Sequence, residues 1–259
     1  KKLVTPFILR RNKKEVLTEL PDKIEQNIIL PFNDEEEKLY VANLAKANKE
    51  LQELYDLEGS DKMQILKLLT RLRQLCLEPR LVYDNIDQPS SKLKACMELI
   101  KTMQENKQKV LLFSSFTSVL DLIAEECQKA GITYYMLTGS TNKEDRRELV
   151  SRFQKDDTTV FLISLKAGGT GLNLTSAEAV IHFDPWWNVS AQNQATDRAY
   201  RIGQKNNVQV FNLVMKDSVE EKIIELQKRK KELADMFVEN NSGGLSQMSK
   251  EDILSLFTM

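Results

Sequence analysis

Short, almost wholly apolar segments alternate with stretches of helical periodicity along most of this chain, and this alternation constrains the fold more than any other feature. The apolar segments that read as strands cover residues 110–113, 134–137, 160–163, 180–183 and 208–214. The stretches with helical spacing cover residues 93–103, 118–130, 142–154, about 189–201 and about 219–238. Apolar strands of this kind are typical of a sheet with helices on both faces. The order of strand and helix therefore predicts an α/β fold built on a parallel, doubly wound sheet.

The first third of the chain has a different organisation. Residues 24–30 are bracketed by prolines and fit a strand. Asn33 or Asp34 is expected to cap the helix that follows, because the acidic run after it suits the positive end of a helix dipole. Residues 33–82 then read as two helices, the second ended by Pro79, and are expected to form a helical hairpin.

These patterns divide the chain into four parts. They are a basic linker with a strand, a helical insertion, the α/β lobe, and a flexible break followed by an amphipathic tail, at residues 1–32, 33–90, 91–238 and 239–259. Since position 1 is Lys and no long apolar segment follows it, the sequence is expected to be a piece of a longer protein rather than one with a signal peptide.

The composition limits the class of protein and its partners. Only 9 Gly and 6 Pro occur among 259 residues, which favours long regular elements over loops or disorder. No apolar run approaches the ~18 residues of a membrane span, so no membrane partner is expected. A net charge of −1 excludes a uniformly basic nucleic-acid coat, and any phosphate-binding face must be a local patch. The three cysteines are far apart, which indicates neither a disulfide framework nor a zinc site and favours a reducing compartment.

A complete nucleotide site of a known type is absent from the sequence. No two glycines have the spacing of a P-loop, and the single Gly-x-Gly at 169–171 is followed by Leu174 where a dinucleotide fingerprint needs a third glycine. The lone His182 lies within a predicted strand and lacks metal or triad partners, so it is interpreted as structural. No metal site is predicted.

Loops at the carboxyl ends of the predicted strands carry the unusual residues, and ligands of parallel sheets bind at that edge. Ser115 follows a buried strand and suits either a phosphate or a helix N-cap, a role that Thr117 would fill equally, and the cap is favoured. The loop with Gly139 and Ser140 is explained as well by turn and cap chemistry as by phosphate binding.

The loop after residues 160–163 is richer in signals. Three glycines occur within four residues, at 168, 169 and 171, which carries an entropic cost unless the backbone bends tightly or approaches a ligand closely. Lys166 adds a point charge beside them. This combination favours a phosphate-bearing ligand over a simple turn.

The last strand-end loop contains Trp186 and Trp187, the two tryptophans of the chain. Burial is the common fate of tryptophan, but an aromatic side chain in such a loop also suits a nucleic-acid groove or base. The following helix is expected to carry four polar residues on one face, because they lie at positions i, i+3, i+4 and i+7. They are Gln194, Asp197, Arg198 and Arg201. That face fits a solvated ion-pair stripe or a triphosphate held by another domain.

Several segments together resemble the Swi/Snf-type DNA-translocating ATPases of helicase superfamily two, and specifically their second, C-terminal RecA-like lobe. Asp-Arg-Ala-Tyr-Arg-Ile-Gly-Gln at 197–204 is similar to the family's motif VI, and 166–174 to its motif V. Weaker matches to motifs IV and IVa and to upstream family segments lie at 110–116, 137–140, 6–11, 20–23 and 72–76. One departure is Tyr200, where the family usually has His.

The resemblance implies a RecA-like lobe with a helical protrusion and C-terminal bracing helices. It also implies that ATP with Mg lies between two lobes and is held mainly by the first, which this sequence lacks, while Arg198 and Arg201 reach the β- and γ-phosphates as arginine fingers. The residues implied to line the nucleotide are Gly169, Gly171, Gln194 and Asp197. Those implied to follow the DNA backbone are Ser115, Gly139, Ser140, Ser164, Lys166, Ala167, Gly168 and Trp187.

The partners implied are double-stranded DNA, the N-terminal ATPase lobe of the same parent and a nucleoprotein target, in an intracellular setting that is cytoplasmic and nucleoid in a prokaryote or nuclear in a eukaryote. Two alternatives stay open: a strand-separating helicase lobe and a non-catalytic α/β module that binds a protein. The motor interpretation expects the two guanidinium groups at the ligand edge of the sheet, outside internal salt links.

Overall fold

The computed structural model describes residues 21–56, 62–168, 172–237 and 250–257. Its centre is a sheet of six parallel strands in the order β1-β6-β5-β2-β4-β3. The strands are β1 (Lys23–Leu30), β2 (Val110–Ser114), β3 (Tyr134–Leu137), β4 (Val160–Ser164), β5 (Ala179–His182) and β6 (Val208–Met215). The predicted parallel α/β sheet is therefore confirmed, with strand ends shifted by about one residue. The strand expected at 24–30 is an edge strand of this same sheet and pairs with β6 from Lys23↔Val208 to Leu30↔Met215.

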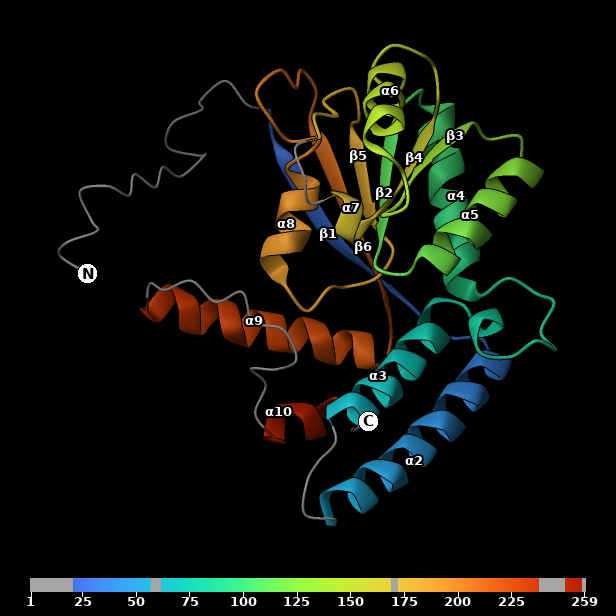
Figure 1. Ribbon diagram of the computed structural model, residues 1–259, viewed down its shortest axis with the longest axis vertical. Coiled ribbons are helices and arrows are strands. Elements are labelled where there is room, and N and C mark those ends of the chain that lie inside the picture. The colour runs from blue at the N-terminus through green and yellow to red at the C-terminus, as the bar shows by residue number, and fades with distance from the viewer. Residues whose placement is uncertain (1–20, 57–61, 169–171, 238–249, 258–259) are drawn as a thin grey trace.

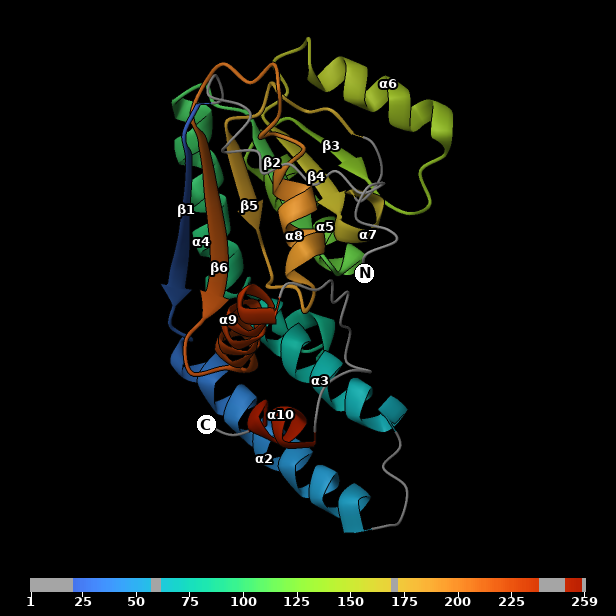
Figure 2. The same cartoon turned by 90° about the vertical axis from the view of Figure 1, so that its left-hand side faces the viewer.

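Helices cover both faces of the sheet, as its apolar strands predict (Figures 1 and 2). One face packs against α4 (Ser91–Glu105) and α5 (Thr117–Lys129), through side chains such as Leu112 and Ile181. The other face packs against α6 (Lys143–Phe153), α7 (Leu165–Gly168) and α8 (Val189–Thr196), through side chains such as Phe161 and Val180. Successive residues of a strand point to opposite faces, so each strand contributes to both clusters.

A second, helical layer lies beyond the carboxyl ends of the strands, below the sheet in Figure 1. It contains α2 (Asp34–Asp56), α3 (Lys62–Leu77), α9 (Val219–Phe237) and α10 (Lys250–Ser255). A short 3-10 helix at Pro79–Leu81 follows α3. These helices share one buried cluster that includes Tyr40, Leu72, Ile223 and Phe257. The hairpin predicted at 33–82 and the amphipathic tail are thus packed together.

Two asparagine side chains fix the start of α2 and its contact with the tail. Asn33 caps α2, since its Oδ1 accepts from the backbone N–H groups of Glu35 and Glu36 at 3.0 and 2.9 Å. The tail joins α2 where the Asn48 side-chain amide donates to the Phe257 carbonyl at 2.7 Å.

A buried ion pair fastens α9 to the α/β lobe. Lys92 Nζ lies 2.7 Å from both carboxylate oxygens of Glu220, and both side chains are fully buried. The same carboxylate accepts from the Met215 backbone N–H at 2.9 Å, at the end of β6. Removing either partner would leave an uncompensated buried charge, so this contact fixes the start of α9.

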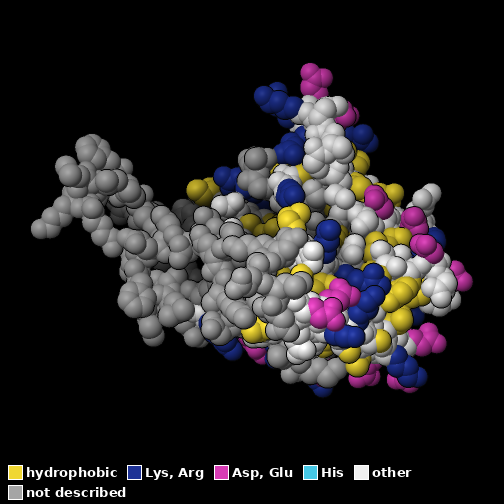
Figure 3. Space-filling view, turned by 60° about the horizontal axis from the view of Figure 1, so that its bottom comes forward, with side chains coloured by type: hydrophobic (Ala, Val, Ile, Leu, Met, Phe, Trp, Pro, Cys, Tyr) yellow, Lys and Arg dark blue, Asp and Glu magenta, His cyan; other side chains and the backbone are white. Residues whose placement is uncertain are grey.

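The surface does not carry one sign of charge. On the face turned forward in Figure 3, Lys and Arg side chains are interspersed with Asp and Glu. Among the described residues, no helix is both long and apolar enough to cross a membrane.

Candidate functional site

The carboxyl ends of β2 and β5 meet around one buried carboxylate. Asp184 Oδ1 accepts from Ser114 Oγ at 2.8 Å and from the Ser115 backbone N–H at 3.0 Å, and Oδ2 accepts from Ser115 Oγ. Oδ2 also accepts from Arg73 Nη2 of α3 at 2.8 Å. The side chains of Arg73 and Asp184 are only 8% and 1% exposed. We call Arg73, Ser114, Ser115 and Asp184 the Asp184 network.

Aromatic rings enclose the charged end of Arg73. Its guanidinium carbon lies 5.0 Å from the ring centre of Phe116 and 5.5 and 5.6 Å from those of Trp186 and Trp187. Trp187 is half-buried and packs against the cluster of the helical layer, while the Trp186 carbonyl accepts from the Gln227 side chain of α9. Most of the Trp187 side chain therefore lies against the protein and not in solvent.

Ser115 does not cap the following helix, and neither does Thr117. The N-cap residue of α5 is Phe116, which has no side-chain cap bond, and the Phe116 N–H donates to Ser114 Oγ at 3.1 Å. The favoured cap interpretation of Ser115 is wrong because Asp184, distant in sequence, takes its hydroxyl hydrogen.

The segment after β4 forms a short helix, α7, where the sequence predicted a loop. Ser164, Ala167 and Gly168 are buried, and Ser164 Oγ accepts from the Ala167 N–H at 3.4 Å. A Cβ on Gly168 would lie 2.9 Å from Cε1 of Phe113, so packing against the sheet accounts for this glycine. Lys166 is exposed, while Gly169 and Gly171 lie outside the described residues.

The loop after β3 is an exposed turn. Gly139 and Ser140 are exposed, and Thr138 Oγ1 lies 2.8 Å from Ser140 Oγ. The N–H of Thr138 donates to Thr141 Oγ1 at 3.1 Å. Asn142 then caps α6, since its Oδ1 accepts from the backbone N–H groups of Glu144 and Asp145 at 3.0 and 2.9 Å. Turn and cap chemistry thus accounts for the loop's conformation and leaves the Gly139–Ser140 backbone accessible.

The predicted one-face arrangement around the arginines needs correction. Helix α8 ends at Thr196 and Asp197 is its C-cap residue, so Gln194, Asp197, Arg198 and Arg201 do not share one continuous helix. Beyond the helix, the Arg198 carbonyl accepts from the Leu174 N–H at 3.0 Å, and Gly203 adopts a positive φ of 101°. We call residues 197–204 the arginine segment.

The arginine segment lies apart from the Asp184 network. Gln204 Nε2 donates at 2.8 Å to the carbonyl of Ala177, just before β5 begins, so the segment runs toward the amino ends of β5 and β6. The end of the segment thus lies away from the carboxyl edge, where the two guanidinium groups were expected. Arg201 is exposed, and its Nη1 donates to the Leu172 carbonyl at 3.2 Å.

The electrostatics of the arginine segment favour a bound anion. Burial lowers the pKa of the Arg198 guanidinium and the nearby charge of Arg201 lowers it further, while Asp197 acts in the opposite direction. A phosphate placed beside Arg198 would oppose both effects and stabilise its charged form. Gln194, one turn earlier in α8, is exposed.

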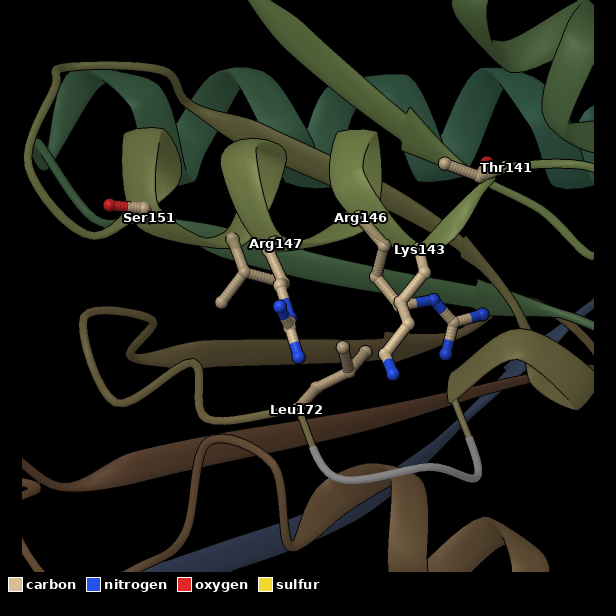
Figure 4. Close-up of a pocket in the computed structure, with 7 residues that line it drawn as sticks. Thr141, Lys143, Arg146, Arg147, Ser151 and Leu172 are labelled. Carbon is tan, nitrogen blue, oxygen red and sulfur yellow. The ribbon is translucent and has the colours of Figure 1, made fainter.

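A cationic pocket of about 670 Å³ adjoins this segment, and the sequence analysis missed it. In Figure 4, Lys143, Arg146 and Arg147 extend from α6 toward Leu172, the residue whose carbonyl accepts from Arg201. Thr141, Val150 and Ser151 complete the lining. Three cationic residues within five positions of an amphipathic helix were the available signal.

His182 is buried and lies against a side chain of α8. His182 is 2% exposed, its Nε2 lies 2.9 Å from Thr196 Oγ1, and burial lowers its pKa to about 4. It is a structural residue, as interpreted from the sequence. Within the part of the chain that the structure describes, no group of three or more His, Cys, Asp or Glu residues is placed to hold a metal ion.

Comparisons with known proteins agree with this architecture. The helicase conserved C-terminal domain matches residues 91–203, and the SNF2-related domain matches residues 1–81. The chain is 38% identical over 98% of its length to 24% of an "Uncharacterized ATP-dependent helicase" of Mycoplasma pneumoniae, and 34% identical over 98% of its length to 24% of the ISWI chromatin-remodeling complex ATPase ISW1 of Saccharomyces cerevisiae. It therefore spans about a quarter of these relatives. The Sulfolobus solfataricus SWI2/SNF2 ATPase core in complex with dsDNA is similar with a TM-score of 0.74 and 32% identity, covering 99% of this chain and 55% of that one.

Proposed function

The chain belongs to the Swi/Snf family of helicase superfamily two, as its C-terminal RecA-like lobe, and from this premise we propose that it is one of two motor lobes of an ATP-dependent translocase on double-stranded DNA. The arginine segment is the observation that carries the proposal. Burial lowers the pKa of Arg198 and the nearby charge of Arg201 lowers it further, and Arg201 is exposed. Such a pair suits a triphosphate presented by another lobe.

In this proposal Arg198 and Arg201 stabilise the negative charge that develops on the β- and γ-phosphates of ATP during hydrolysis. Gln194 and Asp197 flank them and line the nucleotide, together with Gly169 and Gly171. Since the described residues offer no acidic cluster for Mg, the lobe with the P-loop would hold the metal and most of the nucleotide. The isolated chain would then be inactive as a hydrolase.

The proposed DNA surface is narrower than the sequence suggested. Lys166, Gly139 and Ser140 are exposed and suit direct contact with a phosphate backbone. The side chains of Ser115 and Ser164 are bonded within the protein, and Ala167 and Gly168 are buried, so these four residues would shape the loops or offer backbone groups. Trp187 would present only the edge that the helical layer leaves exposed. Contacts of this kind are largely independent of base sequence and weaken with salt.

A relative that acts in a chromatin-remodeling complex extends the proposal to a nucleoprotein target. The decisive experiment uses the full-length parent protein with both lobes. Arg198→Ala and Arg201→Ala should each lower DNA-stimulated ATP hydrolysis by about 10³-fold to 10⁵-fold, because an arginine finger acts on the transition state. Binding of a fluorescent ATP analogue should be largely unchanged.

Lys205→Ala is the matched control, since Lys205 is an exposed cation just beyond the arginine segment. Its hydrolysis rate should equal that of the wild type, and the isolated chain should give no more than trace hydrolysis. Normal turnover in both arginine variants would refute the proposal, and so would robust hydrolysis by the isolated chain.

A further inference from the structure

We propose that Arg73 is a positioning residue through which the helical hairpin α2–α3 sets the two loops that follow β2 and β5, and thereby the grip of this lobe on DNA. The proposal deepens the proposed function and rests on it. Arg73 itself is buried and would not contact DNA.

One guanidinium joins three parts of the chain that are distant in sequence. From α3, Arg73 Nη2 donates to Asp184 Oδ2 at 2.8 Å and to Ser115 Oγ at 2.9 Å, and it approaches the Pro185 carbonyl at 3.4 Å. Ser115 begins the loop after β2, and Asp184 and Pro185 lie in the loop after β5. The two loops also bond to each other directly through Ser115 and Asp184, and Arg73 ties this bonded pair to the helical layer.

The surroundings hold that guanidinium in one plane. Phe116 belongs to the first loop and the two tryptophans to the second, and all three rings lie within 5.6 Å of its central carbon. Arginine combines a planar fork of donors with stacking on aromatic faces, whereas the ammonium group of lysine is a compact point charge. The site thus requires the shape of arginine as well as its charge.

The helical layer reaches the same loop by a second route. Gln227 of α9 donates to the Trp186 carbonyl, and Trp187 packs into the cluster that α2, α3 and α9 share. A displacement of the hairpin relative to the sheet would therefore move the Trp186–Trp187 loop and Ser115 together. This arrangement couples the hairpin to the carboxyl edge of the sheet.

Arg71 supplies a matched control two residues earlier in the same helix. Its Nε donates to Asn43 Oδ1 at 2.9 Å and its Nη2 to the Tyr83 hydroxyl at 3.3 Å, and its guanidinium carbon lies 5.5 Å from the Tyr83 ring centre. These contacts stay within the helical layer and the segment just after α3. Changing Arg71 therefore disturbs the hairpin without touching the strand-end loops.

The first measurement uses this chain and needs neither ATP nor DNA. Trp186 and Trp187 are its two tryptophans, so intrinsic fluorescence reports directly on the Arg73 site. Arg73→Lys should shift the emission and increase acrylamide quenching in a protein that still unfolds cooperatively. Arg71→Gln should leave both signals as in the wild type.

The second measurement uses the full-length parent and separates DNA grip from chemistry. Arg73→Lys should raise the DNA concentration for half-maximal ATPase stimulation by about 10-fold to 100-fold, the cost of misplacing contact groups by roughly 1 Å. It should lower triplex displacement per ATP hydrolysed, while the KM for ATP and the hydrolysis rate without DNA stay as in the wild type. Arg71→Gln should change none of these quantities.

A double-mutant cycle with Ser115→Ala tests whether Arg73 acts through Ser115. If Arg73 acts through Ser115, the effects of Arg73→Lys and Ser115→Ala on DNA stimulation are not additive. Unchanged DNA stimulation in folded Arg73→Lys, an equal loss in Arg71→Gln, or failure of Arg73→Lys to fold would each overturn the proposal, the last by showing a purely structural role. A wild-type parent without DNA stimulation would instead refute the proposed function, and the fluorescence result would be unaffected.

Discussion

The Asp184 network and the arginine segment belong to the same lobe, yet their polar groups are satisfied in opposite ways. In the network, the carboxylate of Asp184 is 1% exposed and accepts hydrogen bonds from three neighbouring residues. In the arginine segment, Arg201 is exposed and donates to a backbone carbonyl. Charge that is already compensated inside the protein sets geometry, whereas charge that faces outward is available to a ligand.

The difference separates the effects expected of mutations in the two regions. Substitutions in the network should act first on stability, because they strand a buried charge or an unsatisfied donor. Substitutions in the arginine segment should act on catalysis and leave the fold intact.

Asp184→Ala should cause the largest loss of stability. It removes the carboxylate and leaves the buried guanidinium of Arg73 without its partner, which costs about 3–5 kcal/mol for a buried pair. Arg201→Ala is the comparison variant and should change the free energy of unfolding by less than about 0.5 kcal/mol, as for most surface substitutions. Both values follow from urea denaturation of this chain at pH 7. Equal losses in the two variants would abolish the distinction between the regions.

His182 lies between the two regions, at the end of β5 and in contact with Thr196 at the end of α8. Burial lowers its pKa from 6.5 to about 4, although Glu25 and Asp184 oppose this shift. Between these two pH values His182 is protonated in the unfolded chain and neutral in the folded chain. Stability from this group is therefore present above pH 6.5 and is lost as the pH falls to about 4, by about 3 kcal/mol in total.

His182→Gln keeps a hydrogen-bonding side chain but cannot titrate, so its loss of stability between pH 7 and pH 4 should be about 3 kcal/mol smaller than that of the wild type. The comparison is clean because the chain contains one histidine. Identical pH dependence in the two proteins would show that His182 is protonated as easily in the folded state as in the unfolded state.

Local pattern predicted the sheet and the helical hairpin because both depend on the periodicity of apolar residues. It failed at the end of α8, where the spacing of Arg198 and Arg201 continues the helical period but the helix ends and the Arg198 carbonyl accepts from the Leu174 N–H. It also missed α7, since a helix of four residues ending in glycine has no detectable period.

The candidate site was predictable only in part for a related reason. Arg198 and Arg201 could be identified from a contiguous motif. The contact between Arg73 and Asp184 joins residues 111 positions apart, and nothing in either local sequence indicates the other. Sequence reasoning therefore found the arginine pair and missed the internal bond between Arg73 and Asp184.

The smallest effect concerns two glycines in the loops predicted to meet DNA. A Cβ on Gly168 would lie 2.9 Å from Cε1 and 3.4 Å from Cδ1 of Phe113, whose buried ring is stacked on His182. Gly168→Ala should therefore cost about 1–3 kcal/mol of stability through overpacking. Around a Cβ on Gly139, no heavy atom of the described residues lies within 4 Å. Gly139→Ala should change stability by less than about 0.5 kcal/mol.

The order of the two glycines should be reversed for DNA binding, where Gly139→Ala is expected to have the larger effect. If the exposed backbone at Gly139 approaches a phosphate closely, the added methyl group should weaken binding of the full-length parent to duplex DNA without a matching loss of stability. Gly168→Ala should weaken binding only to the extent that it destabilises the lobe. A destabilised Gly139→Ala with normal DNA affinity would reverse the division, since the outward-facing loop would then be the structural one.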